Sequence, residues 1–175
     1  MEFHTLPQVR DDALPMFLRM LSVSQATHIE AQTNIPLMFT MLQNCAANIS
    51  EENILFEDGP ATRLNCPGAI FRRRKVDDDG PEGEWVVQAG EKVVAAGGVL
   101  GHYNPPYGDI YMEVAKDARR KGIGSYLVQE LRRVSLEGGW TPAARCDPGN
   151  EASRRTLQRG GLLPCGELVA GEVNN

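Results

Sequence analysis

The stretch DARRKGIGSY (residues 117–126) places three cationic side chains directly before two glycines and then enters an amphipathic helical pattern. Gly122 and Gly124 allow the backbone to come close to a ligand, because glycine has no Cβ and adopts positive φ readily. The first turn of the following helix carries N–H groups without intrahelical partners and the positive end of the helix dipole. The stretch therefore predicts an anion site of the kind that holds phosphate. The alternative is a glycine-rich helix start beside a solvated basic cluster.

Two common phosphate-binding motifs do not fit this stretch. A P-loop needs GxxxxGK followed by Ser or Thr, and the sequence contains no such string. A Rossmann fingerprint needs a third glycine where Leu127 stands, and an acidic residue about twenty residues further on. Asp147 is the only candidate for that acid, and it lies in a DPGN turn that favours a helix start. Neither nucleotide motif explains the glycines.

The remaining sequence predicts helices first and strands later. Apolar residues at helical spacing predict a helical portion over residues 11–49, with Pro36 near the start of its second helix. The polar link THIEAQTN (27–34) is expected to be an exposed loop; a substrate role for His28 and Glu30 is the alternative. The later elements are expected as strands over 53–64 and 68–75, a hairpin over 84–103 that turns at 89–92, and strands over 109–114 and 141–146.

Two helices lie between the later strands. Apolar residues from Ile123 to Val134 share one face of the first, which Gly138 and Gly139 end. Asn150 would cap the second, over 151–159, and residues 162–173 would form a last strand or hairpin. This order predicts an α/β fold with a mixed, partly parallel sheet flanked by helices, as one domain over residues 1–175. The basic run 72–75 and the acids 77–79 are expected to be a solvated edge.

Composition excludes several classes of protein. The 175 residues carry a net charge of −5, which argues against binding nucleic acid through a basic face. No apolar run approaches the roughly 20 residues that span a bilayer, so we expect no membrane segment. The four cysteines show no CxxC pair or zinc-ligand spacing, so we expect reduced thiols in a cytoplasmic protein without a metal site.

Residues 84–162 resemble, in order and spacing, the GNAT superfamily of acetyl-CoA-dependent N-acetyltransferases. The resemblance is carried by the hairpin GEWVVQAGEKVVAAGGV (83–99), by VAKDARRKGIGSYLVQELRR (114–133) and by NEASRRTLQRGGL (150–162). It implies that acetyl-CoA is bound by one set of residues. The pantetheine arm would lie on Met112, Glu113, Val114, Asn150 and Ser153, and the pyrophosphate on a turn begun by Arg119 and formed by Arg120, Lys121, Gly122, Ile123, Gly124 and Ser125. Arg154 and Arg155 would reach the adenosine phosphates, unless they only cover an exposed helix face.

The catalytic groups are less clear. The tyrosine that the family often uses as general acid lies seven residues beyond the asparagine, where this chain has Leu157. Glu113 is the first choice of general base, with Tyr111 and Asp109 on the same face of a regular strand. A bulge, common there in the family, would change that face. Further candidate donors are Tyr103 and Tyr107; His102 is expected to be structural.

These features predict a transferase that moves acetyl from acetyl-CoA to a primary amine by direct attack, since no cysteine has a histidine partner. The acceptor would be a small-molecule or peptide amine. The alternative is a domain of the same fold that binds acetyl-CoA or CoA without catalysis, as a sensor or interaction module. The short tail after Gly161 also leaves room for closing strands from a second copy, that is, a homodimer.

Overall fold

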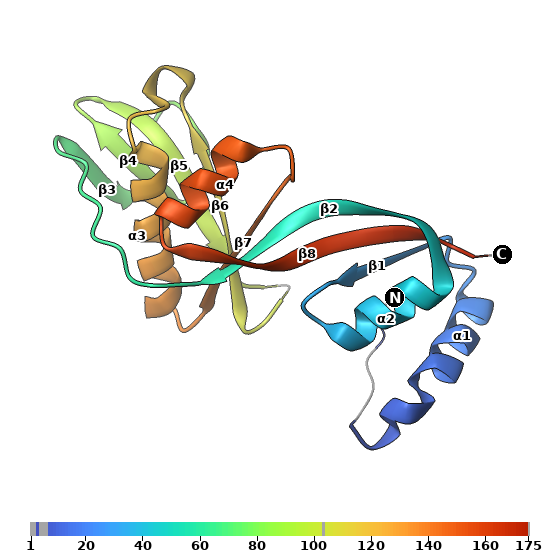
Figure 1. The fold of residues 1–175 in the computed structure, drawn as a ribbon. Coiled ribbons are helices and arrows are strands. Elements are labelled where there is room, and N and C mark those ends of the chain that lie inside the picture. The colour runs from blue at the N-terminus through green and yellow to red at the C-terminus, as the bar shows by residue number, and fades with distance from the viewer. Residues whose placement is uncertain (1–2, 4–6, 103, 175) are drawn as a thin grey trace. The chain divides into compact units, whose positions relative to one another are not determined.

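The computed structural model describes residue 3, residues 7–102 and residues 104–174 (Figure 1). Its α-helices are α1 (Ala13–Ser24), α2 (Pro36–Cys45), α3 (Ile123–Glu137) and α4 (Glu151–Arg159), and two short 3-10 helices are η1 (Pro7–Asp12) and η2 (Lys116–Ala118). Its strands are β1 (His28–Gln32), β2 (Ala46–Asp58), β3 (Ala69–Arg73), β4 (Trp85–Ala89), β5 (Lys92–Leu100), β6 (Tyr107–Val114), β7 (Thr141–Cys146) and β8 (Leu162–Val173).

The chain divides into two compact units. The larger comprises Ile54–Cys165, and the smaller comprises the described residues on either side of that segment. The long strands β2 and β8 contribute to both units. The expectation of a single domain over residues 1–175 stays a prediction.

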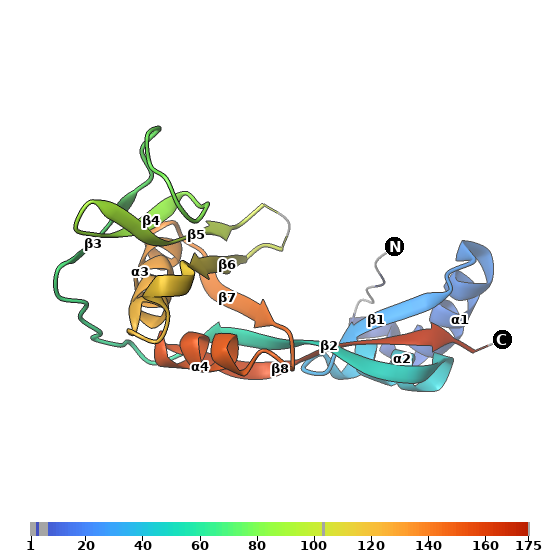
Figure 2. The same ribbon diagram turned by 90° about the horizontal axis from the view of Figure 1, so that it is seen from above.

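The larger unit is a twisted sheet in the order β2-β7-β6-β5-β4-β3 (Figure 2). β6 and β7 are parallel, whereas the other pairings described in this unit are antiparallel. α3 packs against β5 and β6. Its buried face, with Leu127, Val128 and Leu131, forms the core together with strand residues such as Val87 and Ile110. The predicted α/β fold with a mixed, partly parallel sheet and flanking helices is confirmed.

The predicted course of α3 is confirmed in detail. Ile123 begins the helix, and Glu137 is its last residue, directly before Gly138 and Gly139. Gly139 has a φ of 79°, a left-handed conformation that glycine adopts at low cost. The glycine pair therefore turns the chain from α3 into β7.

The smaller unit corrects the expectation of a loop at residues 27–34. His28–Gln32 form β1, which is antiparallel to β8 with Ile29 opposite Gly171. Ile29 and Ala31 are buried among the helices of this unit, whereas His28 and Glu30 are exposed. The segment is a strand because its backbone finds a partner in β8, about 140 residues away in the sequence.

The helical portion also ends earlier than residue 49. α2 stops at Cys45, and β2 begins at Ala46 without an intervening turn. Ala46 has extended backbone angles (φ −130°, ψ 155°), although its N–H still donates to the Leu42 carbonyl. β2 then ends at Asp58, so residues 59–64 of the expected strand are irregular. The tail after Gly161 is one strand of 12 residues rather than a hairpin.

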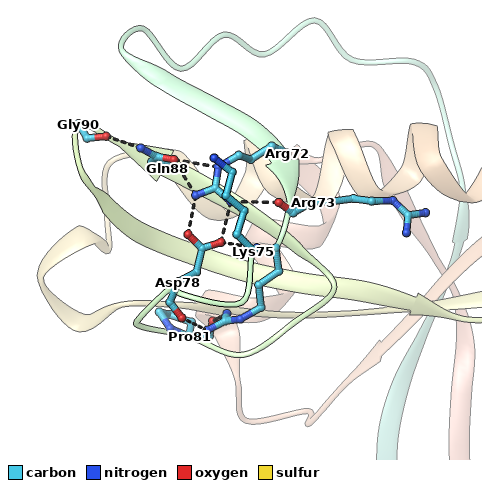
Figure 3. Close-up of polar contacts among 8 residues, drawn as sticks. Arg72, Arg73, Lys75, Asp78, Pro81, Gln88 and Gly90 are labelled. Atoms are coloured by element: carbon cyan, nitrogen blue, oxygen red, sulfur yellow. Dashed lines mark hydrogen bonds and ion pairs between the residues drawn. The ribbon is translucent and has the colours of Figure 1, made fainter.

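Part of the basic run at the end of β3 is an organised network, formed by Arg72, Arg74 and Asp78 (Figure 3). The expected solvated edge holds for the other charged residues, which are exposed: Arg73, Lys75, Asp77 and Asp79. Two Arg72 nitrogens, Nη1 and Nη2, donate to the two carboxylate oxygens of Asp78 at 2.6 and 2.7 Å, and Arg72 Nε donates to Gln88 Oε1 at 2.8 Å. Arg74 donates to the backbone carbonyls of Asp78 and Pro81. The Asp78 side chain is only 11% exposed. The charges pair because the loop between β3 and β4 folds back over them.

Candidate functional site

Strands β6 and β7 diverge partway along β6. Their parallel ladder runs from Tyr107, opposite Thr141, only as far as Asp109, opposite Ala143. β6 continues to Val114 beside β5, whereas β7 pairs with β2 through Cys146. The described part of β6 beyond Asp109 therefore has a strand partner on the β5 side only.

Backbone groups at this edge point into the gap. Ala115 N–H donates to the Val94 carbonyl on β5, and on the other side Thr141 N–H donates to the Pro106 carbonyl. Because backbone groups alternate along a strand, Met112 and Val114 direct theirs away from β5, to the side that β7 has left. The Val114 carbonyl accepts from Arg119 Nε at 3.1 Å. Met112 thus presents an N–H and a C=O where an added extended segment would lie.

A cavity of about 320 Å³ lies at this point, and we call it the β6–β7 cavity. Residues of three strands and of α4 line it: Leu100, Asp109, Ile110, Tyr111, Met112, Arg145, Ser153 and Leu157. Every one of them belongs to the larger unit. The volume is at the small end of the range found for ligand sites.

Two of the three predicted catalytic residues line this cavity, and the third does not. Asp109, Tyr111 and Glu113 share one face of β6, as expected for a regular strand, and the register with β5 is unbroken from residue 109 to 114. A bulge in β6 would have changed this face; the described register shift is instead in the β4–β5 pairing, at Val87 and Gln88. Asp109 and Tyr111 line the cavity, but the exposed Glu113 is not among its lining residues.

Tyr111 and Asp109 each have a defined neighbour. The Tyr111 ring, with the residue 41% exposed, lies over Gly98 of β5. Asp109 Oδ2 lies 3.3 Å from Arg145 Nη2 on β7, so the pair joins the two strands just where they diverge. Arg145 was not identified from the sequence, because nothing in the short strand TPAARC indicates which residue of β6 it faces.

The glycine turn before α3 has the geometry of an anion site. Arg120 and Gly122 have positive φ values of 62° and 81°. α3 begins at Ile123, and no side chain among the described residues caps its first turn. Tyr126 N–H makes a bond to the Gly122 carbonyl, so the amides of the preceding residues face out of the helix start. Lys121 Nζ donates to the Asp117 carbonyl and thereby stiffens the turn.

Gly124 has a packing role as well. A Cβ at this position would lie 3.0 Å from Thr156 Cγ2 on α4 and 3.3 Å from Val114 Cγ2 on β6. The position favours a small residue because α4 and β6 both come close to the first turn of α3. At Gly122, by contrast, a Cβ would meet nothing within 4 Å, so only its backbone conformation favours glycine.

α4 approaches the cavity from its first turn. Asn150 Oδ1 accepts from Ser153 N–H at 3.0 Å, which confirms the predicted cap. Arg155 Nε lies 2.6 Å from Glu151 Oε1, and Arg154 also pairs with Glu151. These ion pairs account for both arginines as part of an exposed helix face.

The cysteine nearest the cavity is a poor nucleophile. Cys146, at the end of β7, is buried, and burial raises the pKa of its thiol, while a hydrogen bond with Ser153 acts in the opposite direction. A thiol with a raised pKa holds little thiolate near neutral pH. No disulfide joins the four cysteines, all of which lie in the described part of the chain.

Comparison with known families identifies the family of the chain. The family model described as "Acetyltransferase (GNAT) family" matches residues 50–161, more than half of the chain. The chain belongs to the GNAT acetyltransferase family. Among curated proteins, none matches the sequence significantly.

Solved structures of GNAT proteins share the fold. An acetyltransferase of the GNAT family from Colwellia psychrerythraea is 14% identical, with a TM-score of 0.76 over 99% of this chain and 76% of the other. A GCN5-related N-acetyltransferase from Kribbella flavida is 13% identical, with a TM-score of 0.56 over 93% of this chain and 74% of the other. At such identities the likeness shows the fold alone.

Two features of the GNAT resemblance bear on catalysis. Leu157, at the position of the family's frequent tyrosine, is 2% exposed and lines the β6–β7 cavity, so a leucine side chain occupies that place. Of the other candidate donors, Tyr107 is exposed and does not line the cavity, and Tyr103 lies outside the described residues. His102, which was expected to be structural, is exposed and does not line the cavity either. Within the described residues, no helix is long and apolar enough to span a membrane.

Proposed function

We propose that this GNAT chain transfers an acetyl group from acetyl-CoA to a primary amine. One observation carries the proposal: β6 and β7 part beyond Asp109, and the uncapped first turn of α3 follows the same strand β6. A strand edge without a strand partner can bind an extended segment, and the helix start that follows can bind phosphate. Together they suit a ligand that is extended at one end and phosphorylated at the other.

The residues present fit coenzyme A along its length. The backbone groups of Met112 would bind the pantetheine arm, and the turn amides from Arg120 to Ser125 would bind the pyrophosphate. Arg119 would hold the turn through its bond to the Val114 carbonyl. Asn150 would contribute its amide nitrogen, and Ser153 its hydroxyl. Acetyl-CoA supplies the activated acyl group, and residues of the protein bind it and transfer the proton.

The transfer forms a carbon–nitrogen bond, breaks a carbon–sulfur bond, and moves one proton from the amine to the departing sulfur. Asp109 in the cavity wall, or Glu113 at its margin, would take the amine proton, directly or through water. Tyr111 would give a proton to the sulfur, in place of the tyrosine that Leu157 replaces. Direct attack by the amine is favoured because the buried Cys146 holds little thiolate.

A second candidate function is binding of acetyl-CoA without catalysis, as a sensor or interaction module. The observation that favours it is the buried Leu157 at the position of the usual acid. Release of CoA thiol from acetyl-CoA in the presence of a panel of amines separates the two functions. An enzyme releases thiol faster with an amine than without one, whereas a binding module does not.

Cofactor binding is tested by titrating acetyl-CoA and CoA into the chain in a calorimeter. The variant Gly122→Asp places a carboxylate at the proposed phosphate site, and Gly90→Asp is its matched control. Both glycines have positive φ, and a Cβ at either meets nothing within 4 Å, but Gly90 lies in the β4–β5 turn. We expect Gly122→Asp to weaken binding at least tenfold and Gly90→Asp to leave it unchanged. Absence of binding by the unchanged chain at millimolar acetyl-CoA would contradict the proposal.

A further inference from the structure

The ion pair between Asp109 and Arg145 lies at the end of the β6–β7 ladder, in the wall of the β6–β7 cavity. Asp109 belongs to the last residue pair of the β6–β7 ladder, and Arg145 lies two residues beyond its partner Ala143. Both side chains line the β6–β7 cavity, and their 3.3 Å contact spans the point where the strands diverge. The cavity wall therefore carries one negative and one positive charge side by side.

The pair is open enough to be separated by a ligand. The side chain of Arg145 is 47% exposed and that of Asp109 is 21% exposed. Ion pairs with this much solvent contact contribute little to stability, because water solvates both charges when they separate. A ligand with two opposite charges can place one charge against each side chain of the pair.

We propose that the acceptor is an amine that carries a carboxylate beside it, as a free α-amino acid does. Asp109 binds its ammonium group and Arg145 binds its carboxylate. This inference rests on the proposed function, since it names the acceptor of that transfer. It also places the Asp109 carboxylate next to the proton that the amine must lose before attack.

The charges of the cavity distinguish this class from its neighbours. A simple amine carries a charge that matches Asp109 alone, and a simple carboxylate carries one that matches Arg145 alone. Only a molecule with both groups matches both charges. The remaining walls include Leu100, Ile110 and Leu157, which favour an apolar side chain on the amino acid.

Binding of four related compounds tests the proposal directly. L-leucine carries both charges, leucinamide and 3-methylbutylamine carry only the positive one, and 4-methylpentanoate carries only the negative one. Each is titrated into the chain in a calorimeter, with and without saturating CoA, and L-methionine and L-phenylalanine extend the amino acid set. We expect an amino acid to bind about tenfold more tightly than its singly charged analogues, because it adds a charge-assisted hydrogen bond.

Variants assign the effect to the pair. Arg145→Gln should lower the affinity for the amino acid to that for the amine, and Asp109→Asn should lower it to that for the carboxylate. Arg145→Lys should retain part of the preference, because it keeps the charge. Arg133→Gln is the matched control, since Arg133 is also a half-exposed arginine paired with a carboxylate, that of Glu137, but on α3 outside the cavity. It should leave the preference unchanged.

The outcomes separate this inference from the proposed function. Equal binding of L-leucine and 3-methylbutylamine, or no binding of any amino acid in either state, overturns the zwitterion site. If acetyl-CoA binds and simple amines release thiol equally well, the transferase stands and this inference fails. If amino acids bind in the expected order but acetyl-CoA does not, the proposed function fails and the site stands.

Discussion

Gly98 and Tyr111 face each other across the β5–β6 ladder, and the tyrosine ring occupies the space that a side chain at position 98 would fill. A Cβ on Gly98 would come within 2.7 Å of the Tyr111 hydroxyl oxygen and 2.8 Å of its Cε1. The glycine thus allows the phenol to lie flat on the sheet in the wall of the β6–β7 cavity. A glycine on the neighbouring strand β5 therefore decides where the side chain of this candidate acid lies.

Tyr111→Phe removes the proposed proton donor while keeping the ring. We expect kcat for acetyl transfer to fall about 100-fold or more, which is the usual contribution of a positioned acid. The affinity for CoA should stay within twofold, because the backbone of β6 is unchanged. Steady-state kinetics and calorimetry on the same sample measure both quantities.

Gly98→Ala should reproduce part of this loss without touching the hydroxyl, because the new Cβ displaces the ring. The chain would still unfold cooperatively, and its affinity for CoA would persist. If Gly98→Ala leaves kcat unchanged while Tyr111→Phe lowers it, the ring position is unimportant. If neither variant lowers kcat, Tyr111 is not the acid.

Gly124 is predicted to be sensitive to size. Gly124→Val pushes a branched side chain against Thr156 and Val114, and overpacking of this kind costs about 1–3 kcal/mol of the free energy of unfolding. Gly124→Ala should cost much less, because its Cβ contacts of 3.0 and 3.3 Å require only a small shift and alanine favours helix by up to about 1 kcal/mol. Urea unfolding of both variants measures the difference; equal values would show that α4 gives way freely.

The network of Arg72 and Asp78 predicts a dependence of stability on pH. The hydrogen bonds from Arg72 and from Lys75 N–H hold the pKa of Asp78 well below its usual range. A carboxyl with a depressed folded-state pKa stabilises the fold fully above its unfolded pKa, about 3.9, and this contribution is lost as the pH falls toward the folded pKa. Asp78→Asn should therefore lower the Tm near pH 7.

The difference in Tm between the unchanged chain and Asp78→Asn should shrink as the pH falls below about 4. Asp79→Asn is the control, because it removes an exposed carboxylate directly beside Asp78 in the sequence. Thermal melts from pH 7 to pH 3 follow the comparison. A difference that stays constant over that range would mean that the charge of Asp78 does not stabilise the loop.

Gln129 of α3 makes hydrogen bonds to the irregular segment after β2. Its Oε1 accepts from Thr62 Oγ1 at 2.8 Å and from Leu64 N–H at 2.6 Å, and its Nε2 donates to the Leu64 carbonyl at 3.2 Å. Gln129→Ala leaves partly buried backbone groups without these partners and should cost about 1–3 kcal/mol of the free energy of unfolding. By comparison, Gln158→Ala, at an exposed position of α4, should lower the free energy of unfolding by less than about 0.5 kcal/mol. Faster proteolysis near residue 63 would locate the effect, and equal stability of the two variants would exclude it.

The sequence predicts the larger unit well because its signals there are local. The 3.6-residue spacing of α3, the glycines that bound it and the Asn150 cap each act within a few residues, and the structure bears all of them out. β1 was missed because Ile29 and Ala31 provide only two apolar positions within a polar stretch. The change from α2 to β2 was missed because Cys45 and Ala46 are consecutive and no turn residue separates the two elements.

In the candidate site, too, the sequence predicts the features formed by neighbouring residues and not the contacts between distant ones. The turn from Arg119 to Ser125 was found because its residues are neighbours in the sequence. The contact between Asp109 and Arg145 depends on the register of two parallel strands, with Asp109 opposite Ala143, which no local pattern encodes. The exclusion of Glu113 from the lining of the cavity likewise depends on where β7 leaves β6.

The pairing of β1 with β8 has a consequence for synthesis on the ribosome. His28 lies opposite Glu172, so β1 emerges long before the strand that must cover its edge. Residues 54–165, by contrast, hold the whole larger unit in one continuous stretch that can collapse as it leaves the exit tunnel. Until translation nears residue 172, the nascent chain exposes an unpaired β1 edge, a surface that chaperones bind and that promotes aggregation.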